Sequence, residues 1–183
     1  PNDPRLGQQW AISNTGQLIS PGPGLFDPGT AGADIKVEGA WNTTIGSRDS
    51  IVAVIDSGVN YMHEDLAANM WINPGEIPGN GIDDDGNGFI DDVYGFDFAD
   101  LDPDPMDTNV AQGHGTRVAG VIAAVGNNGV GITGVAQSAS IMALKVARSN
   151  PTSGDLSGLF PTSAIVAAFD YVIAQRQRGV NIV

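Results

Sequence analysis

The chain has 183 residues, of which 42% are apolar, and its 21 acidic and eight basic residues give a net charge of −13 at pH 7. This apolar share excludes an intrinsically disordered chain, and no apolar run is long enough for a membrane span. Only Lys36 and Lys145 are lysines, so there is no basic patch for binding nucleic acid. Cysteine is absent, which excludes disulfides, thiolate catalysis and cysteine-ligated zinc.

The first 34 residues are rich in Pro and Gly and predict an extended N-terminal segment over 1–34. After it, Ile35, Val37, Ala40 and Trp41 have the spacing of one helical face. Residues 51–55 are continuously aliphatic and predict a strand that is buried on both faces.

Helices and strands alternate in the rest of the chain. The sequence predicts helices over 114–125 and 164–176, the second closed by a glycine, and buried strands over 141–146 and 181–183. Strands that alternate with helices favour an α/β fold with a parallel sheet. Because the last strand stops within its apolar run, we expect a longer domain. The helical stripes are Val118, Val121, Ile122 and Val125 in the first helix, and Ile165, Ala168, Phe169, Val172 and Ile173 in the second.

Two polar residues stand where an open α/β sheet places its ligand crevice. Asp56 directly follows the strand over 51–55, and His114, flanked by two glycines, opens a helix. Taken singly, Asp56 reads as a turn or capping residue and His114 as a structural histidine. Together they can form a pair in which the carboxylate holds one imidazole nitrogen and leaves the other to accept a proton.

These segments resemble those of the subtilisin-like serine proteases, the subtilases. The resemblance rests on Val-Ile-Asp-Ser-Gly around Asp56, on His-Gly-Thr-x-Val-Ala-Gly from His114, and on the segments 131–136, 140–146 and 181–183. It implies a three-layer α/β fold with a mainly parallel sheet that is incomplete in this chain. Residues 1–183 would then be the N-terminal part of a single catalytic domain.

The resemblance also implies a function. The complete protein would be a secreted or extracellular serine endopeptidase that cleaves polypeptides with an Asp-His-Ser triad, to which this chain contributes Asp56 and His114. Residues 154–160 resemble the strand that pairs with an extended peptide substrate.

The chain lacks a serine in the family's Gly-Thr-Ser-Met-Ala setting. Ser163 follows Pro161-Thr162 and is better interpreted as capping the start of the helix over 164–176. Without a nucleophile there is no covalent intermediate, so we expect the chain alone to be inactive. Its partner would be the C-terminal remainder of its own catalytic domain.

An acidic insertion over 72–107 predicts a calcium loop. Ten aspartates lie between Asp83 and Asp107, and the spacing of oxygen ligands from Asp83 resembles that of an EF-hand loop, although the glutamate expected at position 12 is missing. The calcium would be structural, and the alternative is an acidic solvent-exposed loop. The candidate ligands are Asp83, Asp85, Asn87, the carbonyl of Phe89, and Asp91.

The family resemblance implies a second calcium site in the loop after the histidine helix. Its ligands would be Asp65, the Asn128 side chain and the carbonyls of Val130 and Ile132.

Two other functions remain open at the level of the sequence. The chain could belong to a pseudoprotease that keeps the fold without the nucleophile, or to a calcium-binding interaction module whose acidic loop is the functional part. A Gly-Thr-Ser-x-Ala segment in the parent protein would support the protease, and a substituted serine would support the pseudoprotease.

Overall fold

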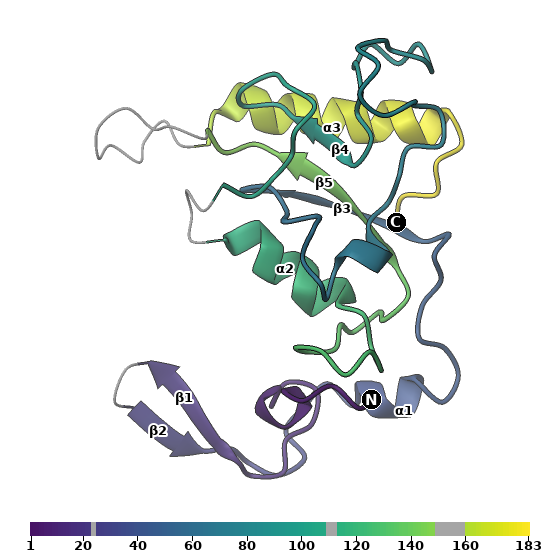
Figure 1. Cartoon of the computed structure of the whole chain (residues 1–183). Helices are drawn as coiled ribbons and strands as arrows, with labels where there is room; N and C mark the ends of the chain where they lie inside the picture. The colour runs from purple at the N-terminus through teal and green to yellow at the C-terminus, as the bar shows by residue number, and fades with distance from the viewer. Residues whose placement is uncertain (23–24, 109–112, 149–159) are drawn as a thin grey trace.

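The structure, a computed structural model, describes residues 1–22, 25–108, 113–148 and 160–183. A parallel sheet in the order β3-β5-β4 lies between helix α2 on one face and helix α3 on the other (Figure 1). This arrangement confirms the predicted α/β class and its three layers. The elements are β3 (Ile51–Asp56), β4 (Gly95–Asp97), α2 (His114–Ala123), β5 (Ser140–Lys145) and α3 (Thr162–Gln177).

Strand β5 is the centre of the sheet, and all six of its residues are buried, as its apolar sequence predicts. Strand β3 is less buried than expected: only Ile51 and Val54 are buried, and its other four residues are partly exposed. The reason is its place beside β5 at one side of the sheet, where Ile182 adds a single parallel bridge to Ile51 in the described residues. The predicted last strand is therefore represented by this one bridge.

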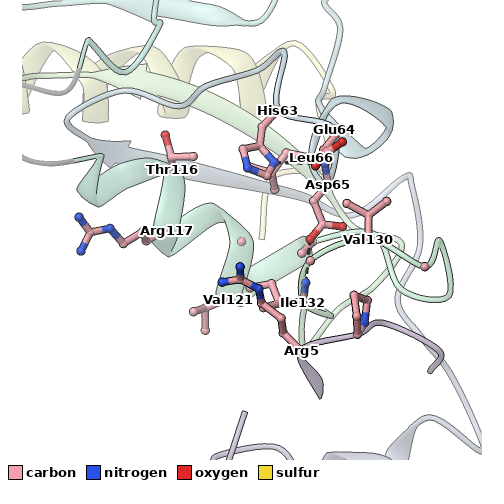
Figure 2. A pocket seen from close by; sticks show the side chains of 15 residues that line it. Arg5, His63, Glu64, Asp65, Leu66, Thr116, Arg117, Val121, Val130 and Ile132 are labelled. Carbon is pink, nitrogen blue, oxygen red and sulfur yellow. Dashed lines mark hydrogen bonds between the residues drawn. The ribbon is translucent and has the colours of Figure 1, made fainter. Parts of the chain in front are cut away.

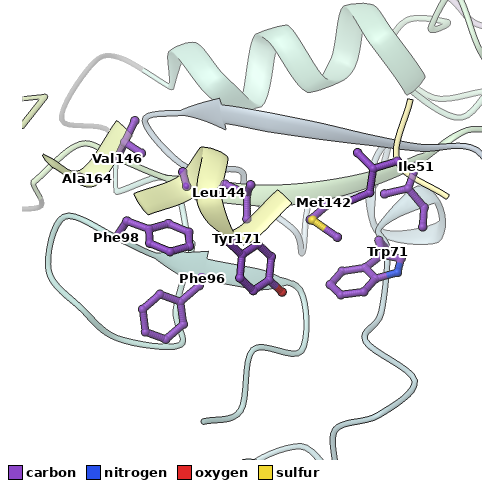
Figure 3. Close-up of a cluster of buried hydrophobic side chains, with 11 residues drawn as sticks. Ile51, Trp71, Phe96, Phe98, Met142, Leu144, Val146, Ala164 and Tyr171 are labelled. Carbon is purple, nitrogen blue, oxygen red and sulfur yellow. The ribbon is translucent and has the colours of Figure 1, made fainter. Parts of the chain in front are cut away.

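Two apolar clusters hold the layers together. One lies between the sheet and α2 and includes Val54, Val59, Leu66, Ala119 and Ile141. The other lies between the sheet and α3 and includes Phe96, Phe98 and Tyr171 (Figure 3). These three rings and that of Phe89 meet edge to face. Neither α2 nor α3 has the length and apolar character that a membrane crossing requires.

The buried faces of both helices differ from the predicted stripes. Small residues of α2, among them Ala119 and Ala123, face the sheet, whereas Val121 is 58% exposed. In α3 the buried residues are Ala164, Ala168, Tyr171 and Gln175, and the predicted Phe169 and Ile173 are exposed. Small side chains allow a helix to approach a sheet closely, which explains the alanines on both buried faces, and in α3 Tyr171 also packs in the buried cluster.

The ends of α3 test two further predictions. Its N-cap is Pro161, and no side chain caps it, so the prediction that Ser163 caps this helix is wrong; Ser163 lies inside the first turn. At the other end Gly179 has a φ of 98°, and Val180 N–H donates to the Gln175 carbonyl, which is the glycine-terminated end that the sequence predicts.

The N-terminal region has more structure than an extended segment. It contains a 3₁₀ turn, η1 (Leu6–Gln8), and an antiparallel pair, β1 (Leu18–Gly22) and β2 (Leu25–Pro28). The helix expected at 35–41 is the single turn α1 (Val37–Ala40), because Lys36 before it is left-handed with a φ of 58°. The remaining element is a second 3₁₀ turn, η2 (Ala67–Asn69).

Candidate active site

The ends of β3 and α2 bring the two predicted polar residues into contact. The imidazole Nδ1 of His114 lies 2.8 Å and 2.9 Å from the two carboxylate oxygens of Asp56. Asp56 also accepts a hydrogen bond from the Ser57 backbone N–H at 2.7 Å. A carboxylate facing Nδ1 fixes the tautomer in which Nδ1 carries the proton, which leaves Nε2 as the proton acceptor.

Exposure differs between the two side chains. Asp56 is 15% exposed, whereas the His114 side chain is 63% exposed. The carboxylate is therefore sheltered and the imidazole reachable from solvent. This is the arrangement that a general base needs if a nucleophile from another segment is to approach it.

Close backbone contact sets the spacing of this pair. A Cβ at Gly115 would lie 2.2 Å from the Gly58 carbonyl oxygen and 3.0 Å from the Asp56 Cβ, so only glycine fits at the second position of α2. The glycine after His114 thus allows α2 to approach β3 closely enough for the two side chains to meet.

A small hollow of about 300 Å³ opens beside the pair. Apart from Asp56 and His114, its lining is apolar and comes from β3, the end of β5 and the start of α3. These apolar residues are Ile55, Val146, Phe160, Ile165 and Phe169.

Two predicted calcium ligands, Asp83 and Asp85, lie close to Glu76, a residue that the sequence analysis did not single out. Carboxylate oxygens of Glu76, Asp83 and Asp85 all lie within 4.8 Å of one another. Glu76 is buried, and the Asp85 Oδ1 is buried without a hydrogen bond in the described residues, while a guanidinium nitrogen of Arg178 lies 3.7 Å away. Oxygen donors of this kind suit a hard divalent cation such as calcium.

Two other predicted ligands of this loop, Asp91 and Asn87, accept hydrogen bonds from backbone N–H groups. Both carboxylate oxygens of Asp91 accept backbone N–H groups from residues 79–81, and the Asn87 side-chain oxygen accepts the Phe89 N–H. The Phe89 ring packs in the aromatic cluster. Backbone N–H donors from Gly88 and Asn87 hold the pKa of Asp83 below its ordinary value, so this carboxylate stays ionised.

Comparison with known proteins identifies the family. The model of the subtilase family matches residues 47–180, which is most of the chain and includes both members of the pair. The chain belongs to the subtilase family.

Curated relatives and solved structures agree with this membership. Over 71% of its own length, the chain is 42% identical to subtilisin-like protease 1 of Plasmodium vivax. Over 78% of its own length, it is 32% identical to a halolysin-like extracellular serine protease of Natrialba magadii. It spans only 19% and 20% of the lengths of these two relatives.

The fold is also similar to that of solved proteases. A protease of Pseudoalteromonas arctica matches with a TM-score of 0.57 and 27% identity over 92% of this chain and 42% of its own. A serine protease of Aeromonas sobria, solved in complex with a chaperone, matches with a TM-score of 0.55 and 30% identity over 77% of this chain and 19% of its own. These matches confirm the predicted fold class, an incomplete subtilisin-like α/β fold.

The second predicted calcium loop of this subtilase chain closes around Asp65. Asp65 is 2% exposed and accepts hydrogen bonds from the Asn128 side-chain nitrogen and the Ile132 N–H. Figure 2 shows Asp65 and Ile132 side by side. The Asn128 oxygen instead accepts the Val130 N–H. Calcium at this loop would require the Asn128 amide to turn its oxygen towards Asp65.

This loop borders a larger hollow of about 760 Å³, which neither Asp56 nor His114 lines (Figure 2). Asp3, another carboxylate that the sequence did not single out, contacts the same loop. Its Oδ2 accepts the Asn127 N–H, and its Oδ1 is buried without a hydrogen bond in the described residues. His63 is exposed, and its ring accepts the Asp65 N–H.

Sequence signals for the missed residues differ. Glu76 is the only acid between Asp65 and Asp83, in a turn rich in Pro, Gly and Asn, so its isolation could have drawn attention to it. Asp3 has no such signal, because its place depends on a contact with a residue more than a hundred positions away. The substrate strand expected at 154–160 lies, except for Phe160, outside the described residues.

Proposed function

We propose that this chain is the N-terminal part of a serine endopeptidase domain in which Asp56 and His114 are two members of an Asp-His-Ser triad. The contact between the His114 Nδ1 and the Asp56 carboxylate carries this proposal, together with membership in the subtilase family. The serine comes from a segment outside these residues. We therefore expect the chain alone to be inactive and its partner to be the C-terminal remainder of the domain.

In this proposal each residue of the pair has its own role. Asp56 holds the imidazole in the Nδ1-protonated tautomer and stabilises the imidazolium that forms during the reaction. His114 Nε2 takes the serine proton as the hydroxyl attacks the peptide carbonyl, and gives it to the leaving amine. The substrate is a polypeptide, and the apolar hollow beside the pair suits an apolar side chain of that substrate.

Calcium has a structural role in this proposal. The cluster of Glu76, Asp83 and Asp85 is the stronger candidate, because its three carboxylates converge and a divalent cation would offset their repulsion. The loop of Asp65, Asn128, Val130 and Ile132 is the second candidate. A secreted or extracellular location belongs to the same proposal, since one relative is named as an extracellular protease.

Labelling with a fluorophosphonate tests the proposed reaction. We expect the natural protein that contains these residues to be labelled on one serine outside residues 1–183, and His114→Ala to abolish the labelling. An exposed histidine provides a control, because His63→Ala should be labelled like the wild type. Folded wild-type protein that is not labelled would point to a pseudoprotease instead.

A further inference from the structure

The first turn of α2 is held by side chains from other segments. Its N-cap is Gly113, which offers no side chain, and the first N–H groups of a helix have no partner within it. Two of these N–H groups have distant partners. Gly115 N–H donates to the Ser57 Oγ at 2.9 Å, and Thr116 N–H donates to the Asp107 Oδ2 at 3.2 Å.

One carboxylate oxygen of Asp107 accepts hydrogen bonds from three donors. Besides the Thr116 N–H, the Asp107 Oδ2 accepts the Thr116 hydroxyl at 2.8 Å and the Ser57 hydroxyl at 3.3 Å. Ser57 directly follows Asp56, and Thr116 lies two residues after His114. A single carboxylate oxygen therefore joins the two segments that carry the pair.

Backbone contacts support the same junction. Val59 N–H donates to the Pro105 carbonyl, and Asn60 N–H donates to the Thr116 hydroxyl, both at 3.0 Å. The segments 56–60, 105–107 and 115–116 thus contact one another, and Asp107 lies where all three meet. Its negative charge at the N-terminal end of α2 also interacts favourably with the helix dipole.

We propose that Asp107 is a positioning residue for the Asp56–His114 pair, a role that rests on the proposed function. The His114 side chain is 63% exposed, so packing holds it weakly and its direction depends on the backbone of the first turn of α2. Asp107 fixes that turn against Ser57, and through it the imidazole against the Asp56 carboxylate. A displacement of about 1 Å at such a pair costs up to about 100-fold in rate.

Kinetics of variants of the natural protein test this role. With active sites counted by titration, Asp107→Ala should lower kcat by about 10- to 100-fold and change KM by less than about threefold. Asp107→Asn should stay within about threefold of the wild type, because an amide oxygen can still cap the turn. Asp104→Ala is the matched control, since this nearby carboxylate bonds the Tyr61 hydroxyl instead of α2.

A spectroscopic measurement separates positioning from stability. The Nδ1 proton of His114, bonded to Asp56, should give a low-field proton resonance that Asp107→Ala weakens and Asp107→Asn retains. If Asp107→Ala keeps both this resonance and its kcat per active site while only its Tm falls, the residue is merely structural and the proposal is overturned.

The positioning role can be tested even if the wild type is inactive or if Asp107→Ala does not fold. If the wild type neither hydrolyses peptides nor reacts with a fluorophosphonate, the proposed function fails and the His114 resonance alone decides the positioning role. If Asp107→Ala does not fold, Ser57→Ala replaces it, because it removes the link from Gly115 to Asp107. We expect a smaller fall in kcat with KM unchanged, and an unchanged kcat with an intact resonance would overturn the proposal.

Discussion

At the scale of single residues, the site depends on a few close contacts. Asp56 is sheltered, His114 is exposed, and the backbone of α2 lies directly against the turn that follows β3. Small changes in these contacts should therefore have measurable consequences for stability.

Gly115→Ala tests the close approach of α2. An added Cβ would lie 2.2 Å from the Gly58 carbonyl oxygen, so the helix must shift, and we expect the free energy of unfolding to fall by about 1–3 kcal/mol. Gly39→Ala in α1 is the matched control. Outside its chain neighbours and its own helix backbone, no described atom lies within 4 Å of its added Cβ, and the substitution should be neutral or stabilising by up to about 1 kcal/mol. Equal effects of the two substitutions on urea unfolding would contradict this account.

Asp92 predicts a dependence of stability on pH. Burial raises the pKa of this carboxyl from 3.8 to about 6, although it accepts hydrogen bonds from Tyr171, Asn73 and Asn87. Since the folded pKa is above the unfolded one, the stabilising contribution is complete below about pH 4 and is lost as the pH rises through 6.

The Asp92→Asn variant has no titrating group at this position, so its comparison with the wild type isolates the contribution of the Asp92 carboxyl to the free energy of unfolding. With a calcium chelator present, the stability of the wild type relative to Asp92→Asn should fall by about 1–3 kcal/mol between pH 4 and pH 7. Unfolding in urea at both pH values measures it, and a constant difference between the two proteins would show that Asp92 does not titrate as proposed.

At the scale of elements, local patterns predicted which segments are helix or strand better than which faces are buried. The runs at 51–55 and 141–146 are strands because their aliphatic residues suit the interior of a parallel sheet. The buried face of α3 was mispredicted because its alanines and Tyr171 pack on the sheet, while the more hydrophobic Phe169 and Ile173 are exposed. Such choices depend on the partner surface, which a sequence pattern does not contain.

The residues of the candidate site also fall into two groups, those that local motifs predict and those that they do not. Asp56 and His114 lie in motifs with local signatures, so their pairing was predictable. Asp3 and Asp107 act through contacts with segments distant in the sequence, at Asn127 and Ser57, and no local pattern marks those contacts. Glu76 lies close in the sequence to Asp83 and Asp85, but it falls outside the spacing of the calcium loop. Asp91 has the spacing of a calcium-loop ligand, and its carboxylate accepts the N–H groups of a neighbouring turn, a contact that the spacing does not predict.

Calcium removal tests the acidic insertion as an element. A chelator should lower the Tm of the wild type, because the carboxylates of Glu76, Asp83 and Asp85 lose the cation that offsets their repulsion. Glu76→Gln should weaken calcium binding, measured by titration calorimetry, by at least about tenfold. Asp170→Asn, an exposed position on α3, is the control and should bind like the wild type. A Tm that is the same with and without the chelator would exclude a structural calcium.

At the scale of the whole molecule, three layers place the ends of β3 and α2 together without the rest of a subtilase domain. The chain covers 42% of one related structure and about a fifth of the curated relatives. The described layers therefore explain how Asp56 and His114 are brought together, and the proposed reaction requires a serine from elsewhere.

Complementation tests this division. The 183-residue chain alone should show no peptide hydrolysis above background, and adding the C-terminal remainder of its domain should restore activity that His114→Ala abolishes. Activity of the isolated chain would contradict the assignment of the nucleophile to another segment.

The most direct test of the central claim is a double-variant cycle on the natural protein. If Asp56 and His114 act as one unit, Asp56→Ala and His114→Ala should each lower kcat by about 10⁴-fold or more, and the double variant should be little worse than His114→Ala alone. Losses that multiply in the double variant would show that the two residues act independently and would contradict the proposed triad.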